Sequence, residues 1–210
     1  MESIVNRVRV KICGLTRGRD VRAAVEAGAD AIGFVFAEGS KRLLQPDHAA
    51  SLVREVPPFI ARVGLFLNQE AESVARILDQ VSLNLLQFHG TEDALYCGQF
   101  GLPYIKAVTV DSEWAVEKAE QQYTDAAGLL LDSHVAGGLG GTGRVFDWRR
   151  IGQSRLPLIL AGGLTVENVN AAVRQVRPWA VDVSSGVEDS PGIKSADKIQ
   201  KFINEAKREY

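Results

Sequence analysis

The repeated alternation of short apolar runs with longer amphipathic segments is the feature that most constrains the fold of this chain. The short runs are almost continuously apolar and rich in β-branched residues, as expected of strands that are buried on both faces. We expect eight such strands. They cover residues 8–12, 31–36, 62–67, 83–88, 104–108, 128–132, 157–161 and 180–184.

A segment with the apolar spacing of a helix follows each expected strand. These helices cover residues 20–27, 46–55, 70–80, 92–99, 112–122, 147–151, 166–173 and 194–207. Thr165, with Asn168 three residues later, can cap the seventh helix, and Gly28 can end the first. Eight strand-then-helix units, recurring roughly every 20 to 30 residues, favour a closed (β/α)8 barrel over an open doubly wound sheet.

The composition limits the domain count and the class of protein. No Pro-, Gly- or Ser-rich linker and no block of like charge divides the chain, so we expect a single-domain TIM barrel over residues 1–210. The 24 Lys and Arg against 26 Asp and Glu leave no basic excess for binding nucleic acid. The apolar runs are far shorter than the roughly 20 residues that span a bilayer. The N-terminus lacks the pattern of a signal peptide.

The two cysteines bear on location and on metal binding. Cys13 and Cys97 lie far apart and lack metal-ligand spacing, which fits a reducing compartment better than a disulfide framework. We therefore expect a cytoplasmic protein with no metal, no membrane and no nucleic acid among its partners.

The active site of such a barrel lies at the carboxyl ends of the strands, so the polar residues and glycines there are the candidates. Gly162-Gly163 and Ser185-Gly186 follow the seventh and eighth strands, where barrels commonly hold a phosphate group. Their backbone N–H groups can approach an oxyanion closely. The alternative is that these glycines only form tight turns, but their pairing favours phosphate. The other candidates are Lys11, Cys13, Ser40, Arg42, Asn68, His89, Lys106, Asp132 and Ser184.

A glycine-rich stretch at residues 138–143 also satisfies the dinucleotide-binding pattern G-x-G-x-x-G. The helix expected after it is short, and the next strand ends in Leu160-Ala161-Gly162, where a dinucleotide site would need an acidic residue. We therefore interpret the stretch as a flexible loop that closes over a phosphorylated substrate.

Cys13 and Asp132 are the candidates for proton transfer, because they follow the first and sixth strands on opposite sides of the expected barrel mouth. A thiolate can act as a base and a carboxylic acid as a proton donor, and Lys11 could lower the pKa of the thiol. A buried structural cysteine and a loop-capping aspartate are the alternatives. Arg42 can bind a carboxylate with its planar fork or be a solvated loop charge. For His89, a hydrogen-bonded structural role is the favoured interpretation.

Several motifs together resemble the phosphoribosylanthranilate isomerase family. The KICG start, the QFHG strand end and the GGTG…FDW loop are specific to this family in combination, whereas AGGL and SSG occur in many phosphate-binding barrels. The motifs are VKICGLT at 10–16, GFVF at 33–36, SKR at 40–42, VGLFLN at 63–68, LQFHG at 86–90, LDS at 131–133, GGTG at 140–143, FDW at 146–148, AGGL at 161–164 and VDVSSGVE at 181–188.

The resemblance implies a cofactor-free Amadori rearrangement in tryptophan biosynthesis, in which N-(5-phosphoribosyl)anthranilate becomes 1-(2-carboxyphenylamino)-1-deoxyribulose 5-phosphate. By the family pattern Asp132 is the general acid, Cys13 is the general base and Arg42 holds the anthranilate carboxylate. The resemblance implies that the phosphate rests on backbone amides of Gly141, Thr142, Gly143, Gly162, Gly163, Ser185 and Gly186. His89 is a further candidate for binding the substrate.

One departure from the family pattern concerns the loop that carries Arg42. The family often has a proline before this arginine, and Lys41 stands there instead, which leaves the rigidity of the loop open.

We expect a free-standing enzyme, a monomer by default with a homodimer as the alternative. Two other functions are weighed: the related isomerase of histidine biosynthesis, which has an aspartate after the first strand where this chain has Cys13, and a non-catalytic barrel that only binds a phosphosugar.

Overall fold

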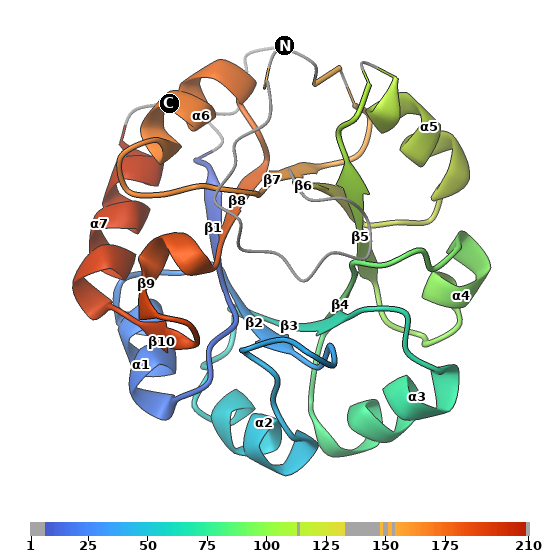
Figure 1. Cartoon of the computed structure of the whole chain (residues 1–210), viewed down its shortest axis with the longest axis horizontal. Helices are drawn as coiled ribbons and strands as arrows, with labels where there is room; N and C mark the ends of the chain where they lie inside the picture. Colours follow the sequence, from blue (N-terminus) through green and yellow to red (C-terminus); the bar gives the residue numbers. More distant parts are fainter. Residues whose placement is uncertain (1–6, 113, 133–147, 149–150, 153, 209–210) are drawn as a thin grey trace.

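Eight parallel strands close into a barrel in the order of the sequence (Figure 1). The computed structural model describes residues 7–112, 114–132, 148, 151–152 and 154–208. The predicted fold class is confirmed, and each predicted strand agrees with an observed one to within two residues at either end. The strands are β1 (Arg9–Cys13), β2 (Ala31–Val35), β3 (Ala61–Phe66), β4 (Leu85–Phe88), β5 (Tyr104–Thr109), β6 (Gly128–Asp132), β7 (Leu158–Leu160) and β8 (Ala180–Val183).

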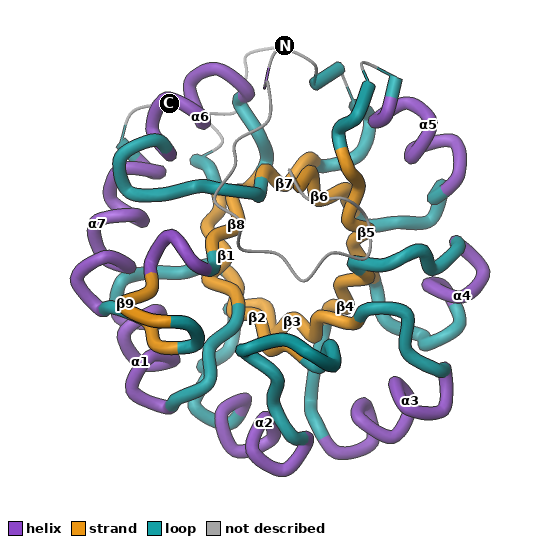
Figure 2. The backbone as a smooth tube through the Cα atoms, viewed as in Figure 1, coloured by secondary structure: helices purple, strands orange, loops and turns teal. Residues whose placement is uncertain are grey.

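The helices form a ring around the outside of the barrel (Figure 2). They are α1 (Gly18–Glu26), α2 (Pro46–Val53), α3 (Ala71–Gln80), α4 (Ala94–Gly98), α5 (Ala115–Gln122), α6 (Val169–Val176) and α7 (Ala196–Lys207). The helix expected at 147–151 lies largely outside the described residues. After α1 the chain turns at Gly28 with a φ of +86°, as predicted for a glycine in the left-handed region.

Five predicted helix starts are displaced by two or three residues. Helix α1 begins two residues earlier than expected, α4 two residues later and α5 three residues later. Helix α6 begins three residues later than expected, because a turn comes first in which Thr165 and Asn168 are linked by a hydrogen bond from the Thr165 amide to Asn168 Oδ1 (2.8 Å). Helix α7 begins two residues later than expected, because Lys194 belongs to a short strand instead.

A small hairpin that the sequence analysis did not predict follows β8. A 3-10 turn, η2 (Ser185–Val187), leads into β9 (Glu188–Ser190), which pairs antiparallel with β10 (Ile193–Lys194). In Figure 1 this hairpin lies beside α1 and α7, at the rim of the barrel. It therefore lies next to the carboxyl ends of β1 and β8.

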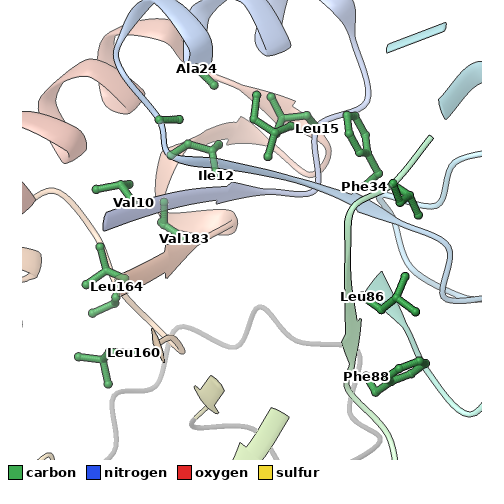
Figure 3. Packing of buried hydrophobic residues seen from close by; sticks show 14 of the residues in the cluster. Val10, Ile12, Leu15, Ala24, Phe34, Leu86, Phe88, Leu160, Leu164 and Val183 are labelled. Atoms are coloured by element: carbon green, nitrogen blue, oxygen red, sulfur yellow. The ribbon is translucent and has the colours of Figure 1, made fainter. Parts of the chain in front are cut away.

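Alternate residues of each strand face the helices or the barrel interior. Figure 3 shows part of the outer layer, in which Val10, Ile12 and Leu86 belong to the large core cluster between strands and helices. A separate interior cluster comprises Ile105, Ala107, Leu130, Ile159, Ala161 and Ala180. Above this apolar layer the inward positions carry polar side chains, so the barrel interior changes from packed core to pocket toward the carboxyl ends.

None of the helices within the described residues has the length and the apolar character needed to cross a membrane.

The outer layer supplies much of the stability of the barrel. Replacing the fully buried Leu86 with alanine removes apolar contacts and leaves a cavity, so we expect the free energy of unfolding to fall by about 2–5 kcal/mol. Leu95, which is 85% exposed, provides the matched control, because Leu95→Ala should change it by less than about 0.5 kcal/mol. Urea unfolding of both variants tests this, and equal losses would contradict the assignment of Leu86 to the core.

Candidate active site

A pocket of about 110 Å³, open to solvent, lies at the carboxyl ends of the strands. All of the predicted site residues that the structure describes line it, namely Cys13, Arg42, His89, Asp132, Gly162, Gly163, Ser185 and Gly186. Gly141, Thr142 and Gly143 fall outside the described residues. The structure therefore brings every site residue that it describes to the end of the barrel where the sequence placed the site.

Cys13 lies at the end of β1 beside a buried ion pair. Lys11 Nζ donates a hydrogen bond to Asp182 Oδ1 at 2.8 Å, and β1 and β8 are in register at these two residues. Gly33 of the neighbouring strand β2 makes room for this group, since a Cβ there would lie 2.7 Å from Cys13 Sγ and 3.0 Å from Lys11 Nζ. The sequence therefore brings a thiol, an ammonium and a carboxylate together inside the barrel.

Burial and charge act on the Cys13 thiol in opposite directions. Burial raises the pKa of the thiol above its ordinary value, and the nearby Asp182 carboxylate adds to this, while Lys11 and Lys194 counteract it. Burial also works against the charge of Lys11, but Asp182 and Cys13 overcome it and raise the pKa of that ammonium. Lys11 thus stays charged beside the thiol, as required of a group that stabilises a thiolate.

Asp132, at the end of β6, meets His89 across the pocket. His89 Nε2 lies 3.2 Å from Asp132 Oδ2, and Gln87 Nε2 lies 3.1 Å from His89 Nδ1. Because the amide nitrogen of Gln87 is a donor, His89 Nδ1 accepts, and Nε2 then carries the ring proton that points to the Asp132 carboxylate. Gln87 is fully buried on an inward position of β4. Gln87 therefore fixes the imidazole, and the imidazole contacts the carboxyl group.

Three residues that the sequence placed among the candidates do not line the pocket, namely Lys11, Lys106 and Asn68. Lys106 points away from the interior, since it alternates along β5 with the inward Ile105 and Ala107. Its Nζ donates to the Gly90 carbonyl at 2.6 Å and lies 3.3 Å from Glu92 Oε2.

The Glu92 carboxylate links Lys106 to Asn68. It also accepts hydrogen bonds from the amides of Asn68 (2.7 Å) and Gly90 (2.8 Å). Lys106 and Asn68 therefore anchor the loop that carries His89.

Two glycine-containing turns line the opposite side of the pocket. Gly162 and Gly163 after β7 have φ values of +78° and +68°, a region that favours glycine. At Gly186 a Cβ would come within 2.0 Å of the Leu164 carbonyl oxygen, so only glycine lets these two turns approach. No hydrogen bond between described residues uses the amide of Gly163, Ser185 or Gly186, which leaves these donors available to an oxyanion.

Arg42 is held by a partner that the sequence analysis did not identify. Its Nε and Nη2 donate to the two carboxylate oxygens of Glu188, each at 2.7 Å. Glu188 Oε1 also accepts from Lys194 Nζ at 2.8 Å. Burial opposes the charge of Glu188, but Arg42 and Lys194 lower the pKa of its carboxyl. The Arg42 side chain is only 12% exposed, so the solvated-charge alternative is wrong.

The sequence candidates did not include Gln87, Asp182, Glu188 and Lys194, each of which contacts a candidate directly. Gln87 and Asp182 could have been found, because each is a polar residue on an inward position of an otherwise apolar strand. Glu188 and Lys194 carry no such signal, since they belong to the unpredicted hairpin. Within the described residues, no group of three or more His, Cys, Asp or Glu side chains could hold a metal ion.

Comparison with known proteins gives consistent matches along almost the whole chain. The family model of N-(5'-phosphoribosyl)anthranilate (PRA) isomerase matches residues 10–205. The N-(5'-phosphoribosyl)anthranilate isomerase of Thiobacillus denitrificans is 55% identical over 202 residues, covering 95% of this chain and 98% of the relative.

Two solved structures extend the comparison to three dimensions. Phosphoribosyl anthranilate isomerase from Thermotoga maritima superposes with a TM-score of 0.84 at 43% identity, covering 95% of this chain and 98% of the other. A phosphoribosyl anthranilate isomerase in complex with reduced 1-(o-carboxyphenylamino)-1-deoxyribulose 5-phosphate superposes with a TM-score of 0.81 at 42% identity and the same coverage.

The opposing effects of Lys11 and Asp182 on Cys13 predict opposite changes in thiol reactivity. Lys11→Met removes the charge that stabilises the thiolate, so alkylation of Cys13 by iodoacetamide should slow by roughly three- to tenfold at pH 8. Asp182→Asn removes a charge that disfavours the thiolate, so alkylation should accelerate. Mass spectrometry separates Cys13 from Cys97, whose pKa burial raises to about 12. A change of the same sign in both variants would refute this account.

Proposed function

The chain belongs to the N-(5'-phosphoribosyl)anthranilate isomerase family, and from this we infer which of its residues carry out the reaction. It is an aldose–ketose isomerase of tryptophan biosynthesis, which converts phosphoribosylanthranilate into 1-(2-carboxyphenylamino)-1-deoxyribulose 5-phosphate. This decides between the functions that the sequence left open. One observation supports our assignment of roles: Cys13 and Asp132 line the same pocket. Cys13 lies near the charged Lys11, and Asp132 lies beside His89.

We propose that Asp132 is the general acid. It donates its proton to the furanose ring oxygen, the bond between that oxygen and C1′ breaks, and the nitrogen lone pair forms a protonated imine. The carboxylate left behind accepts a hydrogen bond from His89 Nε2, 3.2 Å away. This bond stabilises the charge that develops on Asp132 as the ring opens.

Cys13 then acts as the general base. The protonated imine withdraws electrons from C2′ and makes its C–H bond more acidic, so a thiolate can remove that proton. The electron pair of the C–H bond forms the enolamine, which tautomerises to the ketone. Lys11, the charged neighbour of Cys13, stabilises the thiolate before the transfer. The Lys11–Asp182 pair keeps that ammonium in place inside the barrel.

The two ends of the substrate bind on different sides of the pocket. The phosphate accepts hydrogen bonds from the amides of Gly163, Ser185 and Gly186, which make no hydrogen bond to another described residue. The anthranilate carboxylate binds to Arg42 on the rim that β2 leads into. We also propose Gly162, Gly141, Thr142 and Gly143 as phosphate-binding residues on the resemblance alone.

For the state in the cell we propose a single-domain monomer in the cytoplasm. Exposed large apolar side chains of the described residues come from five separate segments, and single exposed apolar residues are normal on a monomer. They are Leu43, Phe59, Leu95, Trp114 and Trp179. A homodimer is the alternative, since the relative from Thermotoga maritima is described as dimeric.

The assigned roles predict that Cys13→Ser and Asp132→Asn each lower kcat by at least about 100-fold, the scale of general acid or base catalysis, while ligand binding survives. The measurement follows the fluorescence of phosphoribosylanthranilate generated in place from anthranilate and phosphoribosyl pyrophosphate. Cys97→Ala and Asp189→Asn are matched controls outside the pocket, and we expect normal turnover from both. Turnover near the wild-type rate in either test variant would remove that residue from the mechanism.

The raised pKa of Cys13 predicts the direction of the pH profile. Because the base must be a thiolate, kcat/KM should increase as the pH rises toward the pKa of this thiol, which burial places above its ordinary value. Lys11→Met should move this limb to still higher pH, since the opposing positive charge is lost. The test is kcat/KM of both proteins from pH 6 to 10. If the rise occurs at the same pH in Lys11→Met as in the wild type, it reflects the titration of a group other than Cys13.

A further inference from the structure

The hydrogen bonds of Arg42 leave a defined part of its guanidinium free. A guanidinium has five N–H donors in a rigid plane. Glu188 takes the edge formed by Nε and Nη2, so the donors of Nη1 and the second donor of Nη2 remain. Arg42 lines the pocket, and these remaining donors form the second edge at which a carboxylate can bind with two hydrogen bonds.

Glu188 is itself fixed by a fully buried lysine. The Lys194 side chain has 0% exposure, and its Nζ contacts Glu188 Oε1 at 2.8 Å and the Ser184 carbonyl oxygen at 3.0 Å. A carboxylate between two cations cannot rotate freely, because each oxygen is held in a charge-assisted hydrogen bond. The group of Arg42, Glu188 and Lys194 keeps one net positive charge, so the pairing with Glu188 does not abolish the attraction for an anion.

The hairpin that carries Glu188 and Lys194 also contacts the loop before Arg42. Thr16 Oγ1 donates to the Gly192 carbonyl at 2.7 Å, which joins the turn of the hairpin to the segment after β1. A Cβ at Gly192 would lie 3.1 Å from the carbonyl oxygen of Lys41. The hairpin thus packs against the position where a proline could otherwise stiffen the loop.

We propose that Glu188, backed by Lys194, is a positioning residue that orients Arg42 so that its free edge binds the carboxylate of the substrate. In this chain the orientation comes from an ion pair across 146 residues and not from a rigid residue at Lys41. The proposal rests on the role assigned to Arg42 above. It makes Glu188 a determinant of selectivity for substrates that carry the carboxylate, without contact to the reacting atoms.

The experiment compares two ligands by titration calorimetry. One is reduced 1-(2-carboxyphenylamino)-1-deoxyribulose 5-phosphate, and the other is the matched compound with a phenyl ring that lacks the carboxylate. The readout is the ratio of their dissociation constants. Glu188→Gln, which keeps the shape but weakens the bond to Arg42, should reduce the preference for the carboxylated ligand by roughly tenfold or more. Binding of the ligand without the carboxylate should change little.

Two companion variants separate the proposal from its premise. Arg42→Met should abolish the preference, and adding Glu188→Gln to it should cause no further loss, because Glu188 acts through Arg42. If Arg42→Met keeps the preference, the role of Arg42 is wrong and the proposal falls with it. If Arg42→Met loses the preference but Glu188→Gln keeps it, the positioning role alone is overturned. Tighter binding of the carboxylated ligand to Glu188→Gln would overturn it too, because Glu188 would then compete with the substrate.

A stability control keeps the result interpretable. Glu188→Gln leaves the buried Lys194 without its carboxylate, so its melting temperature is measured first. If this variant does not fold, Glu188→Asp takes its place, because it keeps the charge near Lys194 but shortens the reach to Arg42. The same loss of preference is then expected, and an unchanged preference overturns the proposal. Asp189→Asn, an exposed neighbour whose carboxylate contacts Lys198 at 3.1 Å, should leave the preference unchanged.

Discussion

The alternation of side chains along each strand of the closed barrel is the constraint on which the rest of the structure depends. One set of positions packs against the helices, and the other set faces an interior that apolar side chains fill at one layer. Polar residues on inward positions near the carboxyl ends must therefore meet one another. Cys13, Gln87, Asp132 and Asp182 come from four strands and converge on one pocket for this reason.

Charges inside such a pocket are stable only when they are paired, because the loss of hydration is otherwise too costly. The structure meets this requirement twice. Lys11 is paired with Asp182, and Glu188 lies between Arg42 and Lys194. Each arrangement fixes a cation where the proposed mechanism needs one, near the thiol in the first case and at the rim of the pocket in the second. The same ion pairs that make burial tolerable thus preorganise the site.

The predictions from sequence succeeded where a local pattern was sufficient. Strand positions follow from continuous apolar runs, and the glycines after β7 and β8 follow from their place at strand ends. Lys106 shows the limit of prediction from a local pattern. It lies between the inward-facing Ile105 and Ala107, and because successive side chains of a strand point to opposite faces, it faces away from the interior. Helix α6 begins late because the Thr165 turn comes before it. The hairpin after η2 was missed because its strands of three and two residues are too short to show a periodic pattern.

The sequence by itself determined the eight barrel strands and their order, the closure of the barrel and the family, because these depend on periodicity and on motifs that are contiguous along the chain. Only the tertiary structure decided which side chains meet. Arg42 and Glu188 are 146 residues apart, and Lys11 and Asp182 are 171 apart. No spacing rule connects such residues. Closure of the barrel brings β1 beside β8, and the register between them sets which charges pair.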